Sequence, residues 1–156
     1  MRKRIVKQDM QEEQASEHNW LNLESLAEVE ISSEDKAYPI ENALISGSDS
    51  GWLAAEAGKQ TLRLIFDTPQ QIELIRLEFR EYNQERTQEF VLRWSSDRQT
   101  FHDIARQQYN FSSPDSTREL EDYNVDLNGV TALELCIIPD ISKGSARASL
   151  AGWGVA

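Results

Sequence analysis

The amino-acid sequence predicts an all-β domain built as an antiparallel sandwich or barrel. Three observations support this prediction. Apolar and polar side chains alternate in several short segments, which is the period of a half-buried strand. Turn-forming residues separate these segments at regular intervals. No strand is followed by a long helix and a second strand, so the sequence contains no βαβ unit.

The predicted elements follow one another from residue 21 to the C-terminus. A single short helix is expected from Pro39 to Leu44, because proline suits the first turn of a helix. The predicted strands lie at residues 21–31, 62–66, 72–80, 90–94, 101–111, 123–127, 133–137 and 148–155.

Two short signatures predict how neighbouring strands are connected. Asp67-Thr68-Pro69 predicts a turn, and Asn128-Gly129 predicts a hairpin between the strands on either side. Glu119 and Glu121 share one face of a strand, and we assign both to a charged outer surface. The patterns around Trp52, Trp94 and Trp153 place these three side chains in the core.

Length and composition indicate one domain with a hydrophobic core. The chain has 156 residues, of which 39% are hydrophobic and 28% are charged. We divide it into a polar N-terminal extension, residues 1–19, and a β domain, residues 20–156. No apolar run approaches the roughly 18 residues that a membrane-spanning helix needs, and no apolar segment follows the basic N-terminus. We therefore expect no membrane span and a cytoplasmic location.

The charge of the chain argues against nucleic acid as a partner. The formal net charge is -11, and the four basic residues among the first twenty are balanced by four acidic ones, so residues 21–156 carry all of it. A domain with this balance repels phosphate backbones at long range.

The sequence also gives little support for catalysis. Its two histidines, His18 and His102, are too few for a zinc site of the usual type. His102 and Asp103 are adjacent in a predicted strand, so they point to opposite faces and cannot form part of a triad. The single cysteine, Cys136, lies in an apolar run and is interpreted as an inert core residue. We expect a protein that is not an enzyme.

Several short motifs occur in an order that points to a known family. They are Ala43-Leu44 followed by Trp52, Gln60 to Asp67 with Ile72 to Leu77, Gln88 to Leu92 with Ser95-Ser96-Asp97 and Phe101, and Arg147 to Gly152. This order resembles the discoidin or coagulation-factor C-type (F5/8 type C) domain of the galactose-binding-domain-like superfamily, over residues 26–154. The resemblance implies a jelly-roll β-sandwich that binds without catalysis, most often to carbohydrate and sometimes to lipid head groups or proteins.

Two departures from the family pattern bear on a structural calcium ion. Ile45-Ser46 stands where the family has Asp-Gly, and Ser149 stands where the closing motif has Glu. The resemblance assigns both family positions to calcium, and losing carboxylates weakens such a site. Asp49, with carbonyl groups of its loop, remains the candidate metal ligand, and we expect no cofactor.

Strand parity predicts where a ligand binds. In an antiparallel sandwich successive connections alternate between the two ends, so the longer connections after residues 32, 80, 111 and 139 meet at one end. Sugar recognition needs an aromatic ring to stack on and planar polar groups that make paired hydrogen bonds. The candidate ligand-binding residues at this end are Asp35, Lys36, Tyr38, Tyr82, Asn83, Arg86 and Lys143. The expected ligand is a carbohydrate, and the alternative is a protein partner in an interaction or assembly role.

Overall fold

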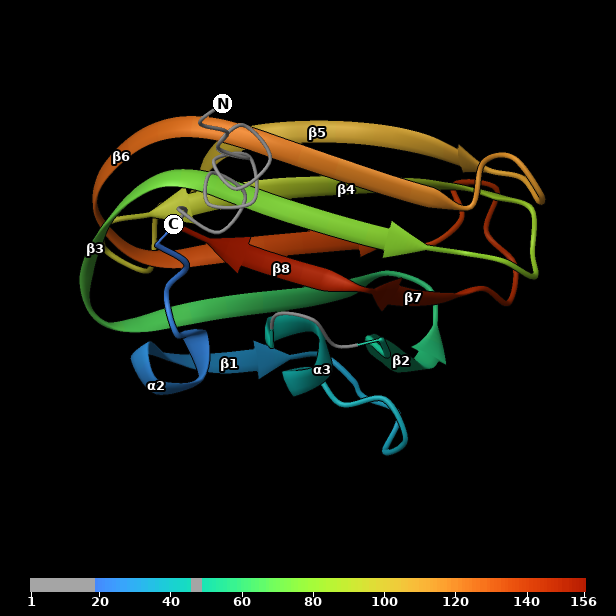
Figure 1. Ribbon diagram of the computed structural model, residues 1–156, viewed down its shortest axis with the longest axis horizontal. Helices are drawn as coiled ribbons and strands as arrows, with labels where there is room; N and C mark the ends of the chain where they lie inside the picture. The colour runs from blue at the N-terminus through green and yellow to red at the C-terminus, as the bar shows by residue number, and fades with distance from the viewer. Residues whose placement is uncertain (1–18, 46–48) are drawn as a thin grey trace, which may run out of the picture.

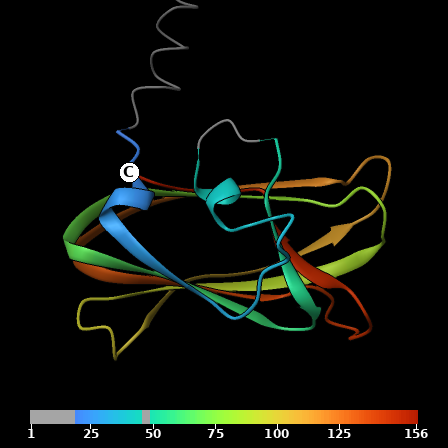
Figure 2. The same ribbon diagram turned by 90° about the horizontal axis from the view of Figure 1, so that it is seen from below.

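The computed structural model describes residues 19–45 and 49–156, and in these ranges it forms an antiparallel β-sandwich. Figures 1 and 2 show two layers of strands stacked face to face, with two short helices beside them. The predicted all-β class is therefore confirmed. The elements are α2 (Leu23–Leu26), β1 (Ala27–Ile31), α3 (Glu41–Leu44), β2 (Trp52–Ala57), β3 (Gln60–Arg80), β4 (Arg86–Ser95), β5 (His102–Phe111), β6 (Arg118–Ile138), β7 (Arg147–Leu150) and β8 (Gly152–Val155).

Strands β3 and β6 belong to both layers, because each has 21 residues and bends near its middle. The first layer has the order β1, β3, β6, β4 and β5; in it, Leu62 of β3 pairs with Ile31 of β1 and with Leu135 of β6. The second layer contains β8 and the other halves of β3 and β6; there Leu77 pairs with Trp153 and with Glu121. Strands β2 and β7 form a separate small sheet.

The two bends replace a turn and a hairpin that the sequence predicted, and both predictions are wrong. Asp67-Thr68-Pro69 lies inside β3, and Asn128-Gly129 lies inside β6. The strands stay paired through the bend, where Gln70 faces Val130 across irregular register. Gly129 has a φ of 68°, a backbone conformation that glycine adopts without steric cost, so β6 bends at this residue without ending.

The N-terminal part of the domain also differs from the prediction. The expected strand at 21–31 is split: residues Leu23–Leu26 form helix α2, and only Ala27–Ile31 form a strand. Asn22 caps the helix, since its side chain accepts a hydrogen bond from the Ser25 amide at 3.4 Å. Residues 1–18 of the predicted extension, 1–19, lie outside the described part of the chain.

The core lies between the two layers. Large side chains from both layers fill it, and Phe79 of β3 stacks on Phe90 of β4 with 5.1 Å between ring centroids. Trp52 and Trp153 are buried as predicted, and Trp94 is partly buried against the same core. Cys136 is a free thiol of intermediate exposure, so it is not the buried core residue that the sequence predicted.

The connections between strands gather at opposite ends of the sandwich. Figure 1 shows the connections 81–85, 112–117 and 139–146 at one end, which we call the loop end, and the bends of β3 and β6 at the other. Backbone hydrogen bonds tie the loop end together, from Glu81 N to Thr117 O at 2.9 Å and from Ile141 N to Thr87 O at 2.9 Å. Among the described residues, no helix has the length and apolar character needed to cross a membrane.

Candidate functional site

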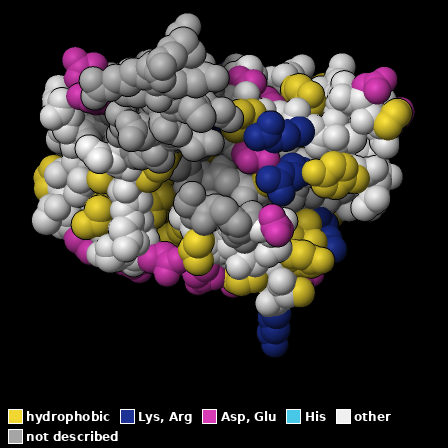
Figure 3. Space-filling model, viewed as in Figure 1, with side chains coloured by type: hydrophobic (Ala, Val, Ile, Leu, Met, Phe, Trp, Pro, Cys, Tyr) yellow, Lys and Arg dark blue, Asp and Glu magenta, His cyan; other side chains and the backbone are white. Residues whose placement is uncertain are grey.

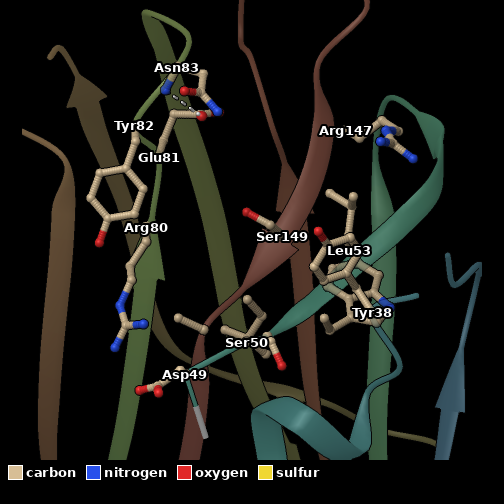
Figure 4. Close-up of a pocket in the computed structure, with 14 residues that line it drawn as sticks. Tyr38, Asp49, Ser50, Leu53, Arg80, Glu81, Tyr82, Asn83, Arg147 and Ser149 are labelled. Atoms are coloured by element: carbon tan, nitrogen blue, oxygen red, sulfur yellow. Dashed lines mark hydrogen bonds between the residues drawn. The ribbon is translucent and has the colours of Figure 1, made fainter. Parts of the chain in front are cut away.

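A cleft opens beside the loop end, between the loop after β1 and the loop after β3. Its volume is about 370 Å³. Figure 4 shows Tyr38 and Leu53 on one side of the cleft and Arg80, Tyr82 and Asn83 on the other. The start of β2 and the junction of β7 with β8 line the space between these sides.

The floor of the cleft depends on a close approach of two backbone segments. A Cβ atom on Gly51 would lie 2.3 Å from the Leu150 carbonyl oxygen, so only glycine fits where β2 begins. The ring of Trp52 is buried, and its Nε1 donates to the Ser33 carbonyl at 3.1 Å. The floor is therefore tightly packed.

The loop that carries Tyr38 is held by an aspartate and an arginine. Asp35 accepts a hydrogen bond from the Ala37 amide at 2.9 Å, which shapes the turn. Arg147 Nη1 donates to the Asp35 carboxylate at 3.1 Å and to the Ala54 carbonyl at 3.3 Å. The hydrogen bond from Ala37, and then the one from Arg147, hold the pKa of Asp35 below its ordinary value. We call Asp35 and Arg147 the exposed staple, because their side chains are 30% and 41% exposed.

The loop that carries Tyr82 is held by a second pair of the same chemistry. Arg86 Nε donates to the Glu81 carboxylate at 2.8 Å, and its Nη1 donates to the Pro139 carbonyl at 2.8 Å. The guanidinium also lies 4.8 Å from the centroid of the Phe111 ring. We call Arg86 and Glu81 the buried staple, because the Arg86 side chain is only 1% exposed.

Two exposed tyrosines remain available to a ligand. Tyr38 is 43% exposed and Tyr82 is 59% exposed, and they lie on opposite sides of the cleft. The side-chain amide of Asn83 and the hydroxyl of Ser149 also line it. Because both tyrosine loops are stapled, these groups are held in place before any ligand arrives.

Arg80 contributes the cationic group on the Tyr82 side. It forms a cluster with Glu78 and Arg118 on neighbouring strands β3 and β6. Figure 3 shows Lys and Arg side chains beside acidic and hydrophobic ones on the face of the molecule that is seen in Figure 1. Arg80 Nε donates to Glu78 Oε2 at 2.7 Å, and Arg118 Nε donates to the same oxygen at 2.9 Å. Burial alone would raise the pKa of Glu78, but the hydrogen bonds from Arg118 and Arg80 lower it overall.

The structure brings some of the predicted ligand-binding residues together and separates others. Tyr38, Tyr82, Asn83 and the candidate metal ligand Asp49 line the cleft. Asp35 and Arg86 lie behind it as parts of the two staples. The buried Arg86 presents no guanidinium to a ligand, so we correct its predicted role from contact to support.

The two predicted lysines do not line the cleft. Lys36 is exposed in the loop before Tyr38, and Lys143 is exposed at a φ of 69° in the turn after β6. Sequence reasoning missed Arg80, Arg147 and Ser149 as lining residues. For Arg80 a signal was present, because it is the last outward residue of a strand that leads into the predicted ligand loop.

The candidate calcium ligand Asp49 belongs to the loop before β2. Residues 46–48 of this loop lie outside the described part of the chain, and Asp49 lies at the edge of the cleft. Within the described residues, no three His, Cys, Asp or Glu side chains are grouped so that they could hold a metal ion.

Comparison with solved structures finds the same fold in several carbohydrate-binding modules. It resembles the family 32 carbohydrate-binding module of AlyQ in complex with 4,5-unsaturated mannuronic acid, with a TM-score of 0.64 and 16% identity over 89% of this chain and 98% of that one. The family 32 module of C. perfringens NanJ in complex with galactose gives a TM-score of 0.64 and 11% identity over 87% and 96% of the two chains. A pectin-binding carbohydrate-binding module gives a TM-score of 0.62 and 19% identity over 83% of this chain and 89% of that one.

These likenesses confirm the discoidin-like, galactose-binding-domain-like fold. No curated protein matches the chain. One family model does match: that of the XRCC1 N terminal domain, over residues 13–132.

Proposed function

The chain belongs to the family of the XRCC1 N terminal domain, and from its fold and its cleft we propose that it is a non-catalytic binding module whose ligand is a carbohydrate. The observation that carries this proposal is the pair of exposed tyrosines on opposite sides of a stapled cleft. A ligand between them would be a small ring with an apolar face and a polar edge.

Stacking on tyrosine suits a sugar for a physical reason. One face of a pyranose ring presents C–H groups, which pack on the negative face of an aromatic ring. Tyr82, at 59% exposed, is the better platform of the two, and Tyr38 would close on the sugar from the other side. The tyrosine hydroxyls can also bond to the edge of the ring.

The polar groups of the cleft suit the hydroxyl groups of a sugar. Asn83 offers an amide with both donors and an acceptor, and Ser149 offers a hydroxyl that can do either. A planar amide can bond to two adjacent sugar hydroxyls at once. Modules of the same fold are described as bound to galactose and to unsaturated mannuronic acid, which supports carbohydrate as the ligand class.

Isothermal titration calorimetry with a panel of saccharides at millimolar concentration tests the proposal. We expect at least one saccharide to bind, and the substitutions Tyr82→Ala and Tyr38→Ala to weaken it about tenfold or more, since stacking and burial contribute about 1 to 2 kcal/mol per ring. Leu120→Ala is the matched control, because Leu120 is a 41% exposed apolar residue of the second layer that does not line the cleft. Binding that survives both tyrosine substitutions would remove the cleft from the proposal.

A second candidate function is the binding of a protein partner at the loop end. The observation that favours it is Ile141, which is 47% exposed in the connection 139–146 and does not line the cleft. Exposed apolar and aromatic side chains on one rigid end are typical of interface hot spots. The substitution Ile141→Asp separates the candidates, because it should release a protein partner and leave saccharide binding unchanged.

A further inference from the structure

We infer that the cleft selects saccharides that carry a carboxylate, and that Arg80 is the residue that recognises this group. The inference rests on the proposed carbohydrate function and specifies its ligand class as acidic sugars. It follows from the hydrogen bonds that Arg80 makes and leaves unmade and from its position below Tyr82 in the cleft.

Around the cleft, Arg80 shares its acidic partner with a second arginine. The exposed staple pairs one carboxylate with one guanidinium, and so does the buried staple. Glu78 is shared: its Oε2 accepts from both Arg80 and Arg118. Two positive charges therefore share one carboxylate at this wall, and the carboxylate of Asp49 offsets the remaining positive charge.

Arg80 also has hydrogen-bonding capacity that faces the cleft. Its single hydrogen bond to the described residues leaves from Nε, so both terminal nitrogens remain available. Figure 4 shows the Arg80 side chain below Tyr82 on the same wall, reaching toward the part of the cleft where Asp49 lies. The two terminal nitrogens of a guanidinium match the two oxygens of a carboxylate, which is the strongest geometry for this recognition.

The Glu78 hydrogen bond fixes the direction of the guanidinium. Because Nε is held at 2.7 Å, the plane of the group is set and less conformational entropy is lost on binding. The Arg80 side chain is 33% exposed, so a carboxylate bound there would be screened less than one on an open surface. A sugar stacked on Tyr82 would then present its acidic substituent to Arg80.

Asp49 provides an internal contrast, because it lines the same cleft with the opposite charge. A carboxylate on the ligand is repelled by Asp49 and attracted by Arg80. Substitutions of the two residues should therefore change the affinity for an acidic saccharide in opposite directions. Neutralising Arg80 should weaken acidic saccharides selectively, and neutralising Asp49 should strengthen them.

Paired probes that differ only at the carboxylate test this inference. We would measure the affinity of trimers of galacturonate, glucuronate and mannuronate, each against its methyl ester, by titration calorimetry at low and physiological salt. At least one acid should bind about tenfold more tightly than its ester, a difference of about 1.4 kcal/mol, since the ester cannot make charged hydrogen bonds to the guanidinium. In Arg80→Gln this preference should disappear, and Asp49→Asn should increase it.

Two further variants control for charge and folding. Arg80→Lys keeps the charge but loses the paired geometry, so it should retain only part of the preference. Arg106→Gln is the matched control, because Arg106 is a 54% exposed arginine of β5 that pairs with Glu89 away from the cleft. An unchanged unfolding midpoint shows that each variant is folded.

The possible results separate the inference from the function on which it rests. Equal binding of an acid and its ester, or a preference that survives Arg80→Gln, overturns the inference and leaves carbohydrate binding in place. If neutral saccharides bind and acidic ones do not, the inference is also wrong. If no saccharide binds and acidic peptides do, both the inference and the proposed function fail.

Discussion

The exposed staple and the buried staple have the same chemistry but different surroundings. Each joins a carboxylate on a tyrosine loop to an arginine on a strand. Arg147 and Asp35 face solvent, whereas the Arg86 side chain is enclosed between Phe111, Glu81 and the Pro139 carbonyl. The difference predicts that an ion pair can position a loop in both settings, but that it contributes strongly to the stability of the fold only where it is buried.

The reason lies in the cost of removing charge from water. An exposed pair gains little, because water competes for both partners and salt screens their attraction. A buried pair is expensive to form, yet removing one partner leaves the other desolvated and unpaired. The two loops of the cleft should therefore respond very differently to the same substitution.

Arg86→Ala should have the largest effect on stability. It leaves Glu81 Oε1 and the Pro139 carbonyl without the arginine donor and opens a space beside Phe111. We expect the free energy of unfolding to fall by about 3 to 5 kcal/mol, as measured by urea denaturation. Arg106→Ala, at an arginine of the first layer whose side chain is 54% exposed, is the control and should change little. A loss as small as that of the control would contradict the distinction between the staples.

Glu119→Gln should have the next largest effect, and in the stabilising direction. Glu119 is buried, and a chain of hydrogen bonds connects it through Gln88 to Arg86. Burial, and then the nearby charge of Glu121, raises the pKa of Glu119 from 4.5 to about 7. A raised carboxyl pKa means that the folded state holds the proton more tightly than the unfolded state. The wild-type domain therefore loses stability as the pH rises from about 4.5 to about 7.

The variant lacks this ionisation, so its stability should exceed that of the wild type at pH 8 and should approach it at pH 4.5. The difference at pH 8 has a ceiling of about 3 kcal/mol, because each unit of pKa shift corresponds to about 1.4 kcal/mol. Urea denaturation from pH 4.5 to pH 8 measures it. Parallel pH curves for the two proteins would show that Glu119 does not titrate in this range.

Arg147→Ala should change binding more than stability. The exposed staple contributes little to the unfolding midpoint, but it holds the loop that carries Tyr38. We expect saccharide affinity to fall a few-fold while the thermal unfolding midpoint stays close to that of the wild type. Differential scanning calorimetry and titration calorimetry on one sample give both quantities. A large drop in the midpoint would place the exposed staple in the same class as the buried one.

The sequence predicted the fold well because strand alternation reports burial directly. The same alternation contained information that our site prediction did not use. Phe90 and Leu92 point into the core, so parity places Gln88 and Arg86 on the inner face as well. We predicted a ligand contact for Arg86 only because it lies next to the loop that carries Tyr82. Its position on the inner face of β4 explains why it instead holds Glu81 of that loop.

Other features could not be obtained from local signals. Asn128-Gly129 has the residues of a hairpin, but β6 continues because β3 bends beside it and keeps their ladder paired. Glu119 was assigned to an outer face, and this assignment is wrong, because the side chain is 2% exposed between the layers. Both errors concern positions where a partner strand distant in sequence determines the environment. The cleft brings together Tyr38, Tyr82 and Asn83, which come from two loops that are distant in sequence. Only the order of the strands in the fold places these two loops at the same end.

The smallest expected effect is that of salt on the two staples. At 1 M sodium chloride the Debye length is about 3 Å, so the attraction between Asp35 and Arg147 is largely screened. The affinity deficit of Arg147→Ala relative to the wild type should therefore shrink when a neutral saccharide is titrated at high salt. The stability deficit of Arg86→Ala should persist, because the arginine side chain is buried and its loss leaves Glu81 Oε1 and the Pro139 carbonyl without their donor at any salt concentration. If high salt removed both deficits equally, the protection of Arg86 from solvent would no longer explain the difference between the two loops.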